Sequence, residues 1–510
     1  MSNSVIVIGA GAAGLAAANK LKNEGVQDVK ILEARDYIGG RVHTIHPSSE
    51  QLKHLSIDVG ASWIHGIKGE DGDSFNPIMD LVEKYGIEYL KTHFNDSNFK
   101  ETRKGSAIYD LISHEKLTEE KVKKLIKLAE AFESNVAEVA RDTKDSDQIS
   151  INDVFEAFCQ QQKINKDSKK YRRLLQLVLV MFDLEYGLDL DKLSIHAADP
   201  YDHSKIAGDN VIFPNGFSQV TDNLAKDFGI GSIYLNQPVT KIDTSNQDKI
   251  IITTEKNGQI EAHCCDYVIN TMPIGVLKSD LVEFTPSLSK EKQQAINQLE
   301  MGDFEKTFLI FDECFWQDDK GSEWLGNISE DTIKNKRTLD MMNFYKYSEN
   351  FDKPMLMVLS SGSYAKALNQ CTKEEKIQII MNELKKMYPN KLIPYPREVI
   401  STNWREDPYS RGSFVAIRKG ISPNLLAEMA RPEANGRLIF AGEGSSKKRY
   451  ATVDGAYKSG KEAAEVVVND INAKQTQAHA GLHSLDAPKV FSVSAANQAS
   501  KLKGSSMSYH

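Results

Sequence analysis

A glycine-rich turn close to the start of the sequence constrains the fold more than any other feature. Gly9, Gly11 and Gly14 form a G-x-G-x-x-G motif between a predicted strand and a predicted helix. The first glycine permits a tight turn, the second lets backbone N–H groups approach a pyrophosphate, and the third lets the helix and strand pack closely. Glu33 ends the next predicted strand, 24 residues after Gly9, where an acid can accept hydrogen bonds from an adenosine ribose. The segment therefore predicts a βαβ unit that binds a dinucleotide.

The stretch that follows, EARDYIGGRVHT, adds further candidate contacts to this ligand. Gly39 and Gly40 are two more positions at which the backbone can approach a ligand closely, and Arg41 adds a guanidinium that can pair with phosphate. These residues can meet the same pyrophosphate from its other side. A simple NAD site does not need this second set of contacts.

The composition is typical of a soluble globular protein of more than one domain, with 510 residues of which 40% are hydrophobic and 26% charged. A formal net charge of −8 argues against general nucleic-acid binding and weakly favours cationic small molecules.

No stretch reaches the roughly 18 apolar residues that a membrane span needs. The five cysteines have no C-x-x-C spacing, which favours a reducing compartment over a disulfide framework. We expect a cytoplasmic protein, because the peroxisomal tripeptide Ser500-Lys501-Leu502 is internal.

The patterning along the chain alternates between two kinds of segment. The first βαβ unit has its predicted helix from Gly11 to about Glu24. Residues 81–200 carry mostly charged helical patterns. The short predicted strands PVTKID, KIIITTE and IEAHC resemble a β-meander that leads through DYVINTM back into the first sheet. A second insertion runs from about 283 to 396, with strands KTFLIF and PMLMVLSSG and one helix. A last strand, turn and helix begin at RLIFAGEG.

Five segments, taken in order, resemble the FAD-dependent amine oxidase family, which includes monoamine oxidases, polyamine oxidases and lysine-specific histone demethylases. They are GAGAAGL…LEARDYIGGRVHT, DVGASWIHG, DYVINTMPIGVLK, NWREDPYSRGSF and RLIFAGEG…TVDGAYKSG, and the resemblance covers nearly all of residues 5 to 470. The resemblance implies an α/β, two-domain FAD-dependent amine oxidase fold with an interrupted Rossmann-like FAD domain and an α+β substrate domain. The implied FAD-binding domain comprises 1–80, 203–284 and 398–472, and the substrate domain comprises 81–202 and 285–397. Residues 473–510 are predicted to be a disordered tail.

The resemblance also implies the chemistry. Members of the family transfer a hydride equivalent from a carbon–nitrogen bond to flavin N5 and pass the electrons to O2. Lys306 matches the lysine that hydrogen-bonds through a water to flavin N5. Ser413 stands where monoamine oxidases carry the cysteine that attaches to flavin, so we expect noncovalent FAD. The predicted cofactor-binding residues are Gly9, Gly11, Gly14, Glu33, Arg35, Gly40, Arg41, Gly60, Ala61, Ser62, Trp63, Val239, Trp404, Gly442, Glu443, Thr452 and Val453.

The stretch GASWIHG gives the second predicted catalytic residue. By resemblance, Gly60 and Ala61 allow close backbone approach to the isoalloxazine ring, Trp63 lines the site, and His65 faces the substrate amine. Spacing alone fits a core histidine as well. As a neutral imidazole, His65 could accept a hydrogen bond from a substrate nitrogen and hold it near N5.

The predicted substrate contacts are aromatic and acidic, as recognition of a cation requires. MFDLEYGLD offers Phe182, Asp183, Glu185 and Tyr186 on one helix, and Glu185 is alternatively a helix-terminal carboxylate in a structural ion pair. The predicted substrate residues are Glu185, Tyr186, Phe414 and Tyr450; we expect no metal.

These residues favour a polyamine oxidase that acts on spermine, spermidine or an N-acetylated polyamine with O2 and releases an aldehyde, a shorter amine and hydrogen peroxide. Thr452 resembles the polyamine oxidase pattern rather than the tyrosine of monoamine oxidases. The alternatives are a ligand-binding flavoprotein of the same fold, similar to the fungal corticosteroid-binding protein, or another amine oxidase. A histone demethylase is disfavoured because the sequence has no sustained heptads.

Overall fold

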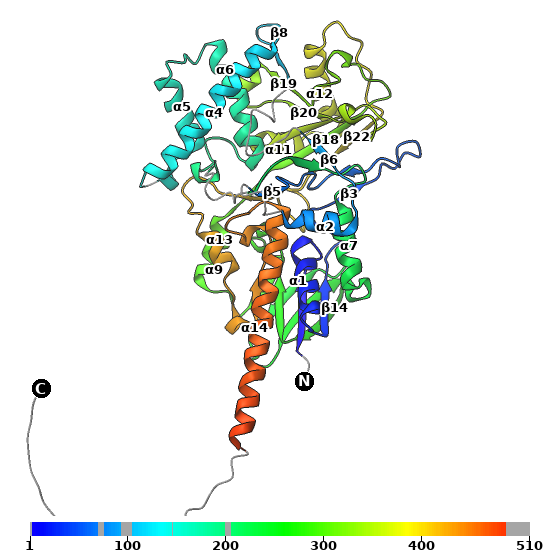
Figure 1. Cartoon of the computed structure of the whole chain (residues 1–510), viewed down its shortest axis with the longest axis vertical. Helices are drawn as coiled ribbons and strands as arrows, with labels where there is room; N and C mark the ends of the chain where they lie inside the picture. Colours follow the sequence, from blue (N-terminus) through cyan, green and yellow to red (C-terminus); the bar gives the residue numbers. More distant parts are fainter. Residues whose placement is uncertain (1–2, 70–75, 93–104, 145, 199–205, 486–510) are drawn as a thin grey trace, which may run out of the picture. The chain divides into compact units, whose positions relative to one another are not determined.

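The first sheet of the computed structural model is parallel and carries the glycine-rich turn. The structure describes residues 3–69, 76–92, 105–144, 146–198 and 206–485. This five-stranded sheet has the order β11-β2-β1-β15-β24. Helix α1 connects β1 to β2, which confirms the predicted βαβ unit (Figure 1). The strands are β1 Ser4–Ile8, β2 Asp28–Leu32, β11 Ile233–Tyr234, β15 Tyr267–Asn270 and β24 Leu438–Phe440, and the helix is α1 Ala12–Asn23.

A four-stranded sheet packs beside the parallel one. Its order is β14-β13-β12-β16, and apolar side chains such as Ile242, Ile250 and Ile252 form a core with Ile6 and Ile8 of β1. The chain passes from β14 directly into β15 of the first sheet, as the predicted meander requires. The strands are β12 Val239–Asp243, β13 Ile250–Lys256, β14 Gln259–Cys265 and β16 Glu283–Thr285.

The third large sheet is built from the segments between the parallel strands. Its seven strands have the order β22-β18-β21-β20-β19-β7-β8, and helices α4, α5, α6, α11 and α12 lie around it in the upper part of Figure 1. The strands are β7 Ala107–Asp110, β8 Glu115–Lys116, β18 Phe304–Ile310, β19 Trp324–Ile328, β20 Asp340–Asn343, β21 Met355–Ser361 and β22 Glu398–Ser401. The helices are α4 Glu119–Asp142, α5 Ile151–Gln161, α6 Lys169–Val178, α10 Glu330–Lys334, α11 Gly362–Asn369 and α12 Lys373–Met387. Because β22 pairs with β18, the first strand after the predicted boundary at residue 398 belongs to this sheet.

Shorter elements connect the three sheets. Directly after α6 the backbone adopts a π-helix, η2 Leu179–Leu184, where the sequence predicts a continuous helix. The paired short strands are β3 Thr44–Ile45 with β4 Ile57–Asp58, β5 Lys68–Gly69 with β9 Ile206–Ala207, β6 Leu90–Thr92 with β10 Asn210–Ile212, and β17 Glu300–Gly302 with β23 Phe414–Ala416. The remaining helices are α2 Pro77–Tyr85, α7 Ser218–Phe228, α8 Ile274–Leu277, α9 Lys290–Gln298 and α13 Leu425–Ala430.

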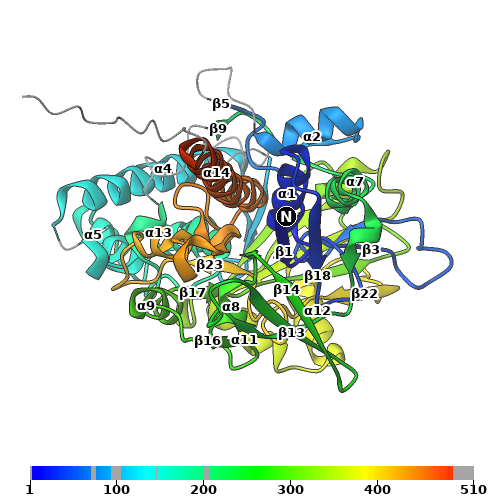
Figure 2. The ribbon, with the colours of Figure 1, turned by 90° about the horizontal axis from the view of Figure 1, so that it is seen from below.

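Helix α14, Val453–Leu485, is longer than the sequence predicts. Its residues 453–468 lie beside α1 (Figure 2), and a Cβ added at Gly460 would come within 2.0 Å of the Ala13 carbonyl oxygen. The disordered tail predicted from residue 473 is wrong for residues 473–485, which are helical. This stretch is rich in Ala, Gln and Leu, which have high helix propensity. Contacts divide the chain into residues 1–468 and 469–510, and residues 486–510 lie outside the described part.

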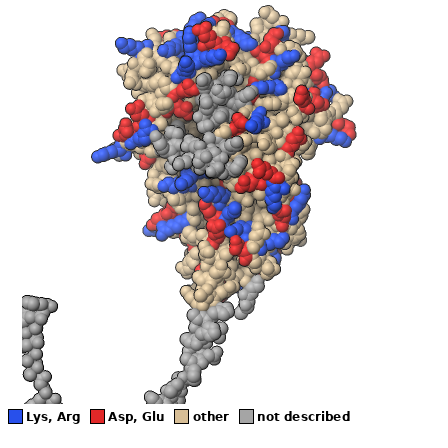
Figure 3. Space-filling view, in the orientation of Figure 1, with Lys and Arg blue, Asp and Glu red and all other residues tan. Residues whose placement is uncertain are grey.

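The surface mixes charges of both signs. The face in Figure 3 carries lysine and arginine interspersed with aspartate and glutamate. Within the described part of the chain, no helix combines the length and the apolar character that crossing a bilayer requires.

Candidate functional site

One cavity of about 1270 Å³ begins at the carboxyl ends of the parallel strands. Residues that follow β1, β2 and β15, such as Gly9, Glu33 and Thr271, line one side of it. Lys306 of β18 and Trp324 of β19 line the other side. Open α/β sheets bind ligands at this edge, because the backbone and helix N-termini there are free to contact them. The cavity therefore joins the predicted dinucleotide site to the seven-stranded sheet.

Twenty-two of the twenty-three predicted site residues line this cavity. They are Gly9, Gly11, Glu33, Arg35, Gly40, Arg41, Gly60, Ala61, Ser62, Trp63, His65, Glu185, Tyr186, Val239, Lys306, Trp404, Phe414, Gly442, Glu443, Tyr450, Thr452 and Val453. The exception is Gly14, where an added Cβ would lie 1.9 Å from the Gly9 carbonyl oxygen. Gly14 thus serves the close helix packing that the motif predicts. The ligand each residue contacts stays a prediction.

The glycine-rich turn leaves room for a pyrophosphate. Gly9 has φ of 100°, which favours glycine, and a Cβ added at Gly11 would meet only the Gly39 carbonyl oxygen at 3.8 Å. Glu33 accepts hydrogen bonds from the backbone N–H groups of Ala10 at 2.7 Å and Arg35 at 2.9 Å. Burial raises the pKa of Glu33, and these N–H groups oppose that rise.

Arg35 holds a neighbouring part of the cavity in place. Its Nη2 donates to Asp407 Oδ1 at 2.5 Å and to Ser410 Oγ at 2.7 Å, and its guanidinium lies 5.7 Å from the Tyr37 ring centroid. The buried Nε of Arg35 has no hydrogen-bond partner within the described residues. A buried donor without a partner is costly, so this atom fits a ligand acceptor. Together with the open face at Gly11, it shows that the residues present fit a dinucleotide.

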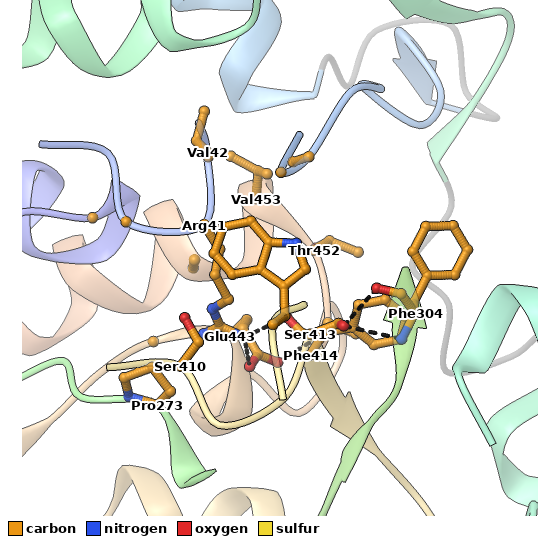
Figure 4. A pocket seen from close by; sticks show the side chains of 18 of the residues that line it. Arg41, Val42, Pro273, Phe304, Ser410, Ser413, Phe414, Glu443, Thr452 and Val453 are labelled. Atoms are coloured by element: carbon orange, nitrogen blue, oxygen red, sulfur yellow. Dashed lines mark hydrogen bonds and ion pairs between the residues drawn. The ribbon is translucent and has the colours of Figure 1, made fainter. Parts of the chain in front are cut away.

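Arg41 and Glu443 form a partly buried ion pair at the centre of the site (Figure 4). Arg41 Nη1 donates to Glu443 Oε1 at 2.9 Å and to the Ser413 carbonyl oxygen at 2.8 Å. The other carboxylate oxygen of Glu443 accepts from the backbone N–H groups of Val415 at 3.2 Å and Ala451 at 3.1 Å. Glu443 therefore joins the turn after β24 to the segment after β2.

The chain's own backbone gives a second reason for glycine at position 60, beside the predicted one. A Cβ added at Gly60 would lie 2.0 Å from the Arg41 carbonyl oxygen, and Ala61 N–H donates to that same oxygen at 3.0 Å. Gly60 is thus required by the approach of the chain's own backbone at Arg41. Its predicted approach to a flavin ring is not needed to explain the glycine.

Lys306 is buried, with 3% of its surface exposed, and it still lines the cavity. Its Nζ donates to the carbonyl oxygens of Asp58 at 3.1 Å and Gly60 at 2.5 Å, and to Ser62 Oγ at 2.5 Å. The ammonium also lies 5.4 Å from the Trp63 ring centroid. Burial lowers the pKa of Lys306 to about 8, and the nearby Asp58 carboxylate opposes that change.

Ser413 packs against the start of β18, on the cavity side (Figure 4). Its Oγ donates to the Phe304 carbonyl oxygen at 2.7 Å and accepts from the Phe304 N–H at 3.0 Å. The rings of Phe304 and Phe414 lie 5.9 Å apart and both line the cavity. These hydrogen bonds join the segment before β23 to the start of β18, and the noncovalent cofactor stays a prediction.

His65 faces the cavity and contacts Asn210, a residue that sequence reasoning missed. Asn210 Oδ1 accepts from the Gly66 N–H at 2.7 Å, which directs its Nδ2 toward His65 Nδ1 at 3.4 Å. An amide nitrogen donates, so this contact favours His65 with its proton on Nε2. That tautomer makes Nε2 a donor, whereas we had expected His65 to accept from the substrate.

The acidic candidates divide between two environments. Glu185 and Tyr186 line the cavity, as does Phe182. Asp183 does not; it accepts a hydrogen bond from Ser361, and burial raises its pKa to about 8. Asp183, which the sequence offers beside Glu185 on the predicted helix, is therefore buried against Ser361 and does not line the cavity.

Two further acids that the sequence analysis missed line the cavity, Glu133 of α4 and Asp340 of β20. Burial raises the pKa of Glu133 to about 7. Glu133, Ala137 and Arg141 all line the cavity and follow one another at intervals of four residues. This helical spacing was a usable signal, since residues four apart share one face of a helix.

Comparison with known proteins identifies the class of the chain. The family described as flavin containing amine oxidoreductase matches residues 12–468. The probable polyamine oxidase 4 of Arabidopsis thaliana is 29% identical over 91% of this chain and 86% of that protein. Polyamine oxidase 4 of Oryza sativa subsp. japonica is 30% identical over 91% of this chain and 88% of that protein.

Two other comparisons have lower sequence identity or cover less of the related protein. Lysine-specific histone demethylase 2 of Homo sapiens is 28% identical over 91% of this chain, which spans 53% of that protein. The solved structure of a putrescine oxidase double mutant with redesigned cofactor binding has a TM-score of 0.68 and 18% identity, covering 91% of this chain and 99% of that one. At this identity the likeness shows the shared fold.

Proposed function

Because the chain belongs to the flavin-containing amine oxidoreductase family, we propose that it is a polyamine oxidase that uses noncovalent FAD and O2. Its products are an aldehyde, a shorter amine and hydrogen peroxide. The observation that carries the proposal is the single cavity that joins the dinucleotide-type turn at Gly9 to Lys306, His65 and a wall of aromatic and acidic side chains. The polyamine oxidases of Arabidopsis and rice, of which the chain spans 86% and 88%, support the substrate class.

The wall suits a cation. Carboxyl groups of Glu133, Glu185 and Asp340 and the rings of Trp63 and Trp324 line the same cavity. Carboxylates attract ammonium groups, and aromatic faces attract cations by up to about 2 kcal/mol when desolvated. A monoamine needs one such contact, whereas a polyamine can use several at once.

The cofactor would be held by residues that follow β1 and β2, at the carboxyl ends of the parallel strands. Gly9, Gly11 and Arg41 would contact its pyrophosphate, and Glu33 its ribose. Bound FAD supplies the redox chemistry by accepting a hydride equivalent from the carbon next to the substrate nitrogen.

The chain's own residues position the reactants. His65, with its proton on Nε2, can donate to the lone pair of a neutral substrate nitrogen and so orient a deprotonated amine. The aromatic side chains Trp63 and Phe304 limit the access of water to the reacting carbon.

An anaerobic titration tests the proposal. The purified flavoprotein is mixed with spermine, spermidine or N-acetylspermine, and its visible absorbance is followed. We expect one of these amines to bleach the flavin and air to restore it. Product analysis then separates 3-aminopropanal, 3-acetamidopropanal and 4-aminobutanal, which identifies the bond that is cleaved. A flavin that stays oxidised with every polyamine would favour a ligand-binding flavoprotein instead.

A further inference from the structure

Lys306 makes hydrogen bonds with all three of its N–H donors. A lysine ammonium has three donors and no acceptor. The three acceptors of Lys306 all lie in residues 58–62, which we call the 58–62 segment: two carbonyl oxygens and Ser62 Oγ, at 3.1, 2.5 and 2.5 Å. The 58–62 segment from Val59 onward lines the cavity. A charged Lys306 therefore has no N–H left for a ligand or water in this arrangement.

Asp58 fixes the beginning of this segment. Its carboxylate Oδ1 accepts from Thr44 Oγ1 at 2.6 Å and from the backbone N–H of Phe217 at 2.9 Å. Thr44 belongs to β3, and Phe217 precedes α7. Lys306 approaches from β18 of the seven-stranded sheet. Asp58 and Lys306 thus connect the two sides of the cavity at one point.

The charges of the two residues depend on each other. Burial lowers the pKa of Lys306 and raises that of Asp58, and each charge opposes the change in the other. Among the described residues, Asp58 is the charged group that acts on Lys306. The adjacent Glu305 is turned away, because its carboxylate accepts from the backbone N–H of Trp404 at 2.8 Å and from Thr402 Oγ1.

We propose that Asp58 is a positioning residue that keeps Lys306 charged and bound to the 58–62 segment, so that Lys306 shapes the cavity wall and reaches into the cavity only by releasing one of its three contacts. The inference rests on the proposed flavin cofactor but not on the identity of the amine. Asp58 does not line the cavity, but Lys306 does, and the charge and position of Lys306 depend on Asp58.

The chain contains a matched control for Lys306. Lys292 of α9 is also buried, and its Nζ donates to the carbonyl oxygens of Met429 at 2.8 Å and Arg431 at 2.7 Å, and to that of Glu428. Burial lowers its pKa to about 8 as well. Lys292 does not line the cavity. Lys292→Met therefore reproduces the loss of a buried, fully bonded lysine without touching the site.

The test uses the holoenzyme without amine. FAD release after dilution is followed by flavin fluorescence, and the flavin absorbance spectrum is titrated from pH 6 to 10. We expect Asp58→Asn and Lys306→Met to raise the Kd of FAD about tenfold, because the 58–62 segment, which lines the cavity from Val59 onward, loses a hydrogen bond that holds it in place. Lys292→Met should lower the temperature of unfolding and leave the Kd unchanged. In Asp58→Asn the alkaline inflection of the spectrum should fall to lower pH, since the carboxylate that raises the pKa of Lys306 is gone.

Two outcomes overturn the proposal. One is an alkaline inflection in Asp58→Asn equal to that of the wild type; the other is a change in Kd with Lys292→Met as large as with Lys306→Met. If Asp58→Asn does not fold, Thr44→Val provides the second variant. It removes a hydrogen bond to the Asp58 carboxylate and should move the inflection in the same direction, whereas an unmoved inflection refutes the role of Asp58. A protein that oxidises no polyamine but shows these shifts would refute the proposed substrate and leave this inference intact.

Discussion

Replacing Glu443 by glutamine should weaken both the fold and the cofactor site, although the two side chains have the same shape. One carboxylate oxygen accepts from Arg41, and the other accepts from the N–H groups of Val415 and Ala451. A glutamine amide has only one oxygen. If that oxygen faces Arg41, two backbone N–H groups lose their acceptor; if it faces them, the amide N–H₂ meets a guanidinium that can only donate.

The magnitude follows from these contacts. Each buried donor that loses its acceptor costs about 1–3 kcal/mol, so the loss of two amounts to about 2–6 kcal/mol. Glu443 is well enclosed, with 6% of its surface exposed, so solvent cannot replace the lost acceptors. Urea unfolding followed by circular dichroism measures the change in the free energy of unfolding, and flavin fluorescence measures FAD release.

The control is Glu465→Gln. Glu465 lies 3.5 Å from Lys20 in an exposed pair, with 54% of its side chain accessible, and such pairs contribute little. We expect Glu465→Gln to unfold at the urea concentration of the wild type. If Glu443→Gln does the same and retains FAD equally well, the assigned hydrogen bonds do not support the site and the reasoning fails.

Three further changes test other parts of the site. His65→Gln and His65→Ala should lower the rate of flavin reduction by amine and leave FAD bound; an unchanged rate in stopped-flow measurements would make the histidine structural. Glu133→Gln should remove a pH dependence: the raised pKa of about 7 leaves this carboxyl neutral below pH 7 and charged above it. The ratio of variant to wild-type KM for a polyamine should therefore rise between pH 6 and 8, and a flat ratio would contradict a substrate contact. Gly14→Ala should prevent FAD retention, because the added Cβ would lie 1.9 Å from the Gly9 carbonyl oxygen. The control Gly231→Ala should retain FAD, because its added Cβ would have no atom within 4 Å. Equal flavin content in the two purified variants would refute the packing argument.

The parts of the site that the sequence predicts are local. The G-x-G-x-x-G turn places its strand, helix and following acid within 33 residues, and the helix predicted from Gly11 to about Glu24 is observed as Ala12–Asn23. Lys306, His65 and Ser413 were found through resemblance to a family, since no local pattern identifies them. The partners of these residues are distant in sequence: Lys306 bonds to Asp58 across 248 positions and Arg41 to Glu443 across 402. Such pairs depend on how three sheets meet, which periodicity in one segment does not determine.

The contrast between Asp183 and Glu185 shows what more could have been predicted from the sequence. The sequence offers both acids on one predicted helix, and the resemblance to the family selects Glu185. Residues two apart on a helix do not share a face, so a shared role was already unfavourable. The structure places Glu185 in the cavity and the Asp183 carboxyl group against Ser361. What the sequence does not show is the π-helix of Leu179–Leu184, in which Val180, Met181, Phe182 and Leu184 all line the cavity. A wider backbone turn changes which side chains face the ligand, and π-helical turns occur frequently at functional sites. Tertiary packing therefore decides which acid of the segment around η2 faces the cavity. Glu133 lies on the regular helix α4, where the helical period alone could have identified it.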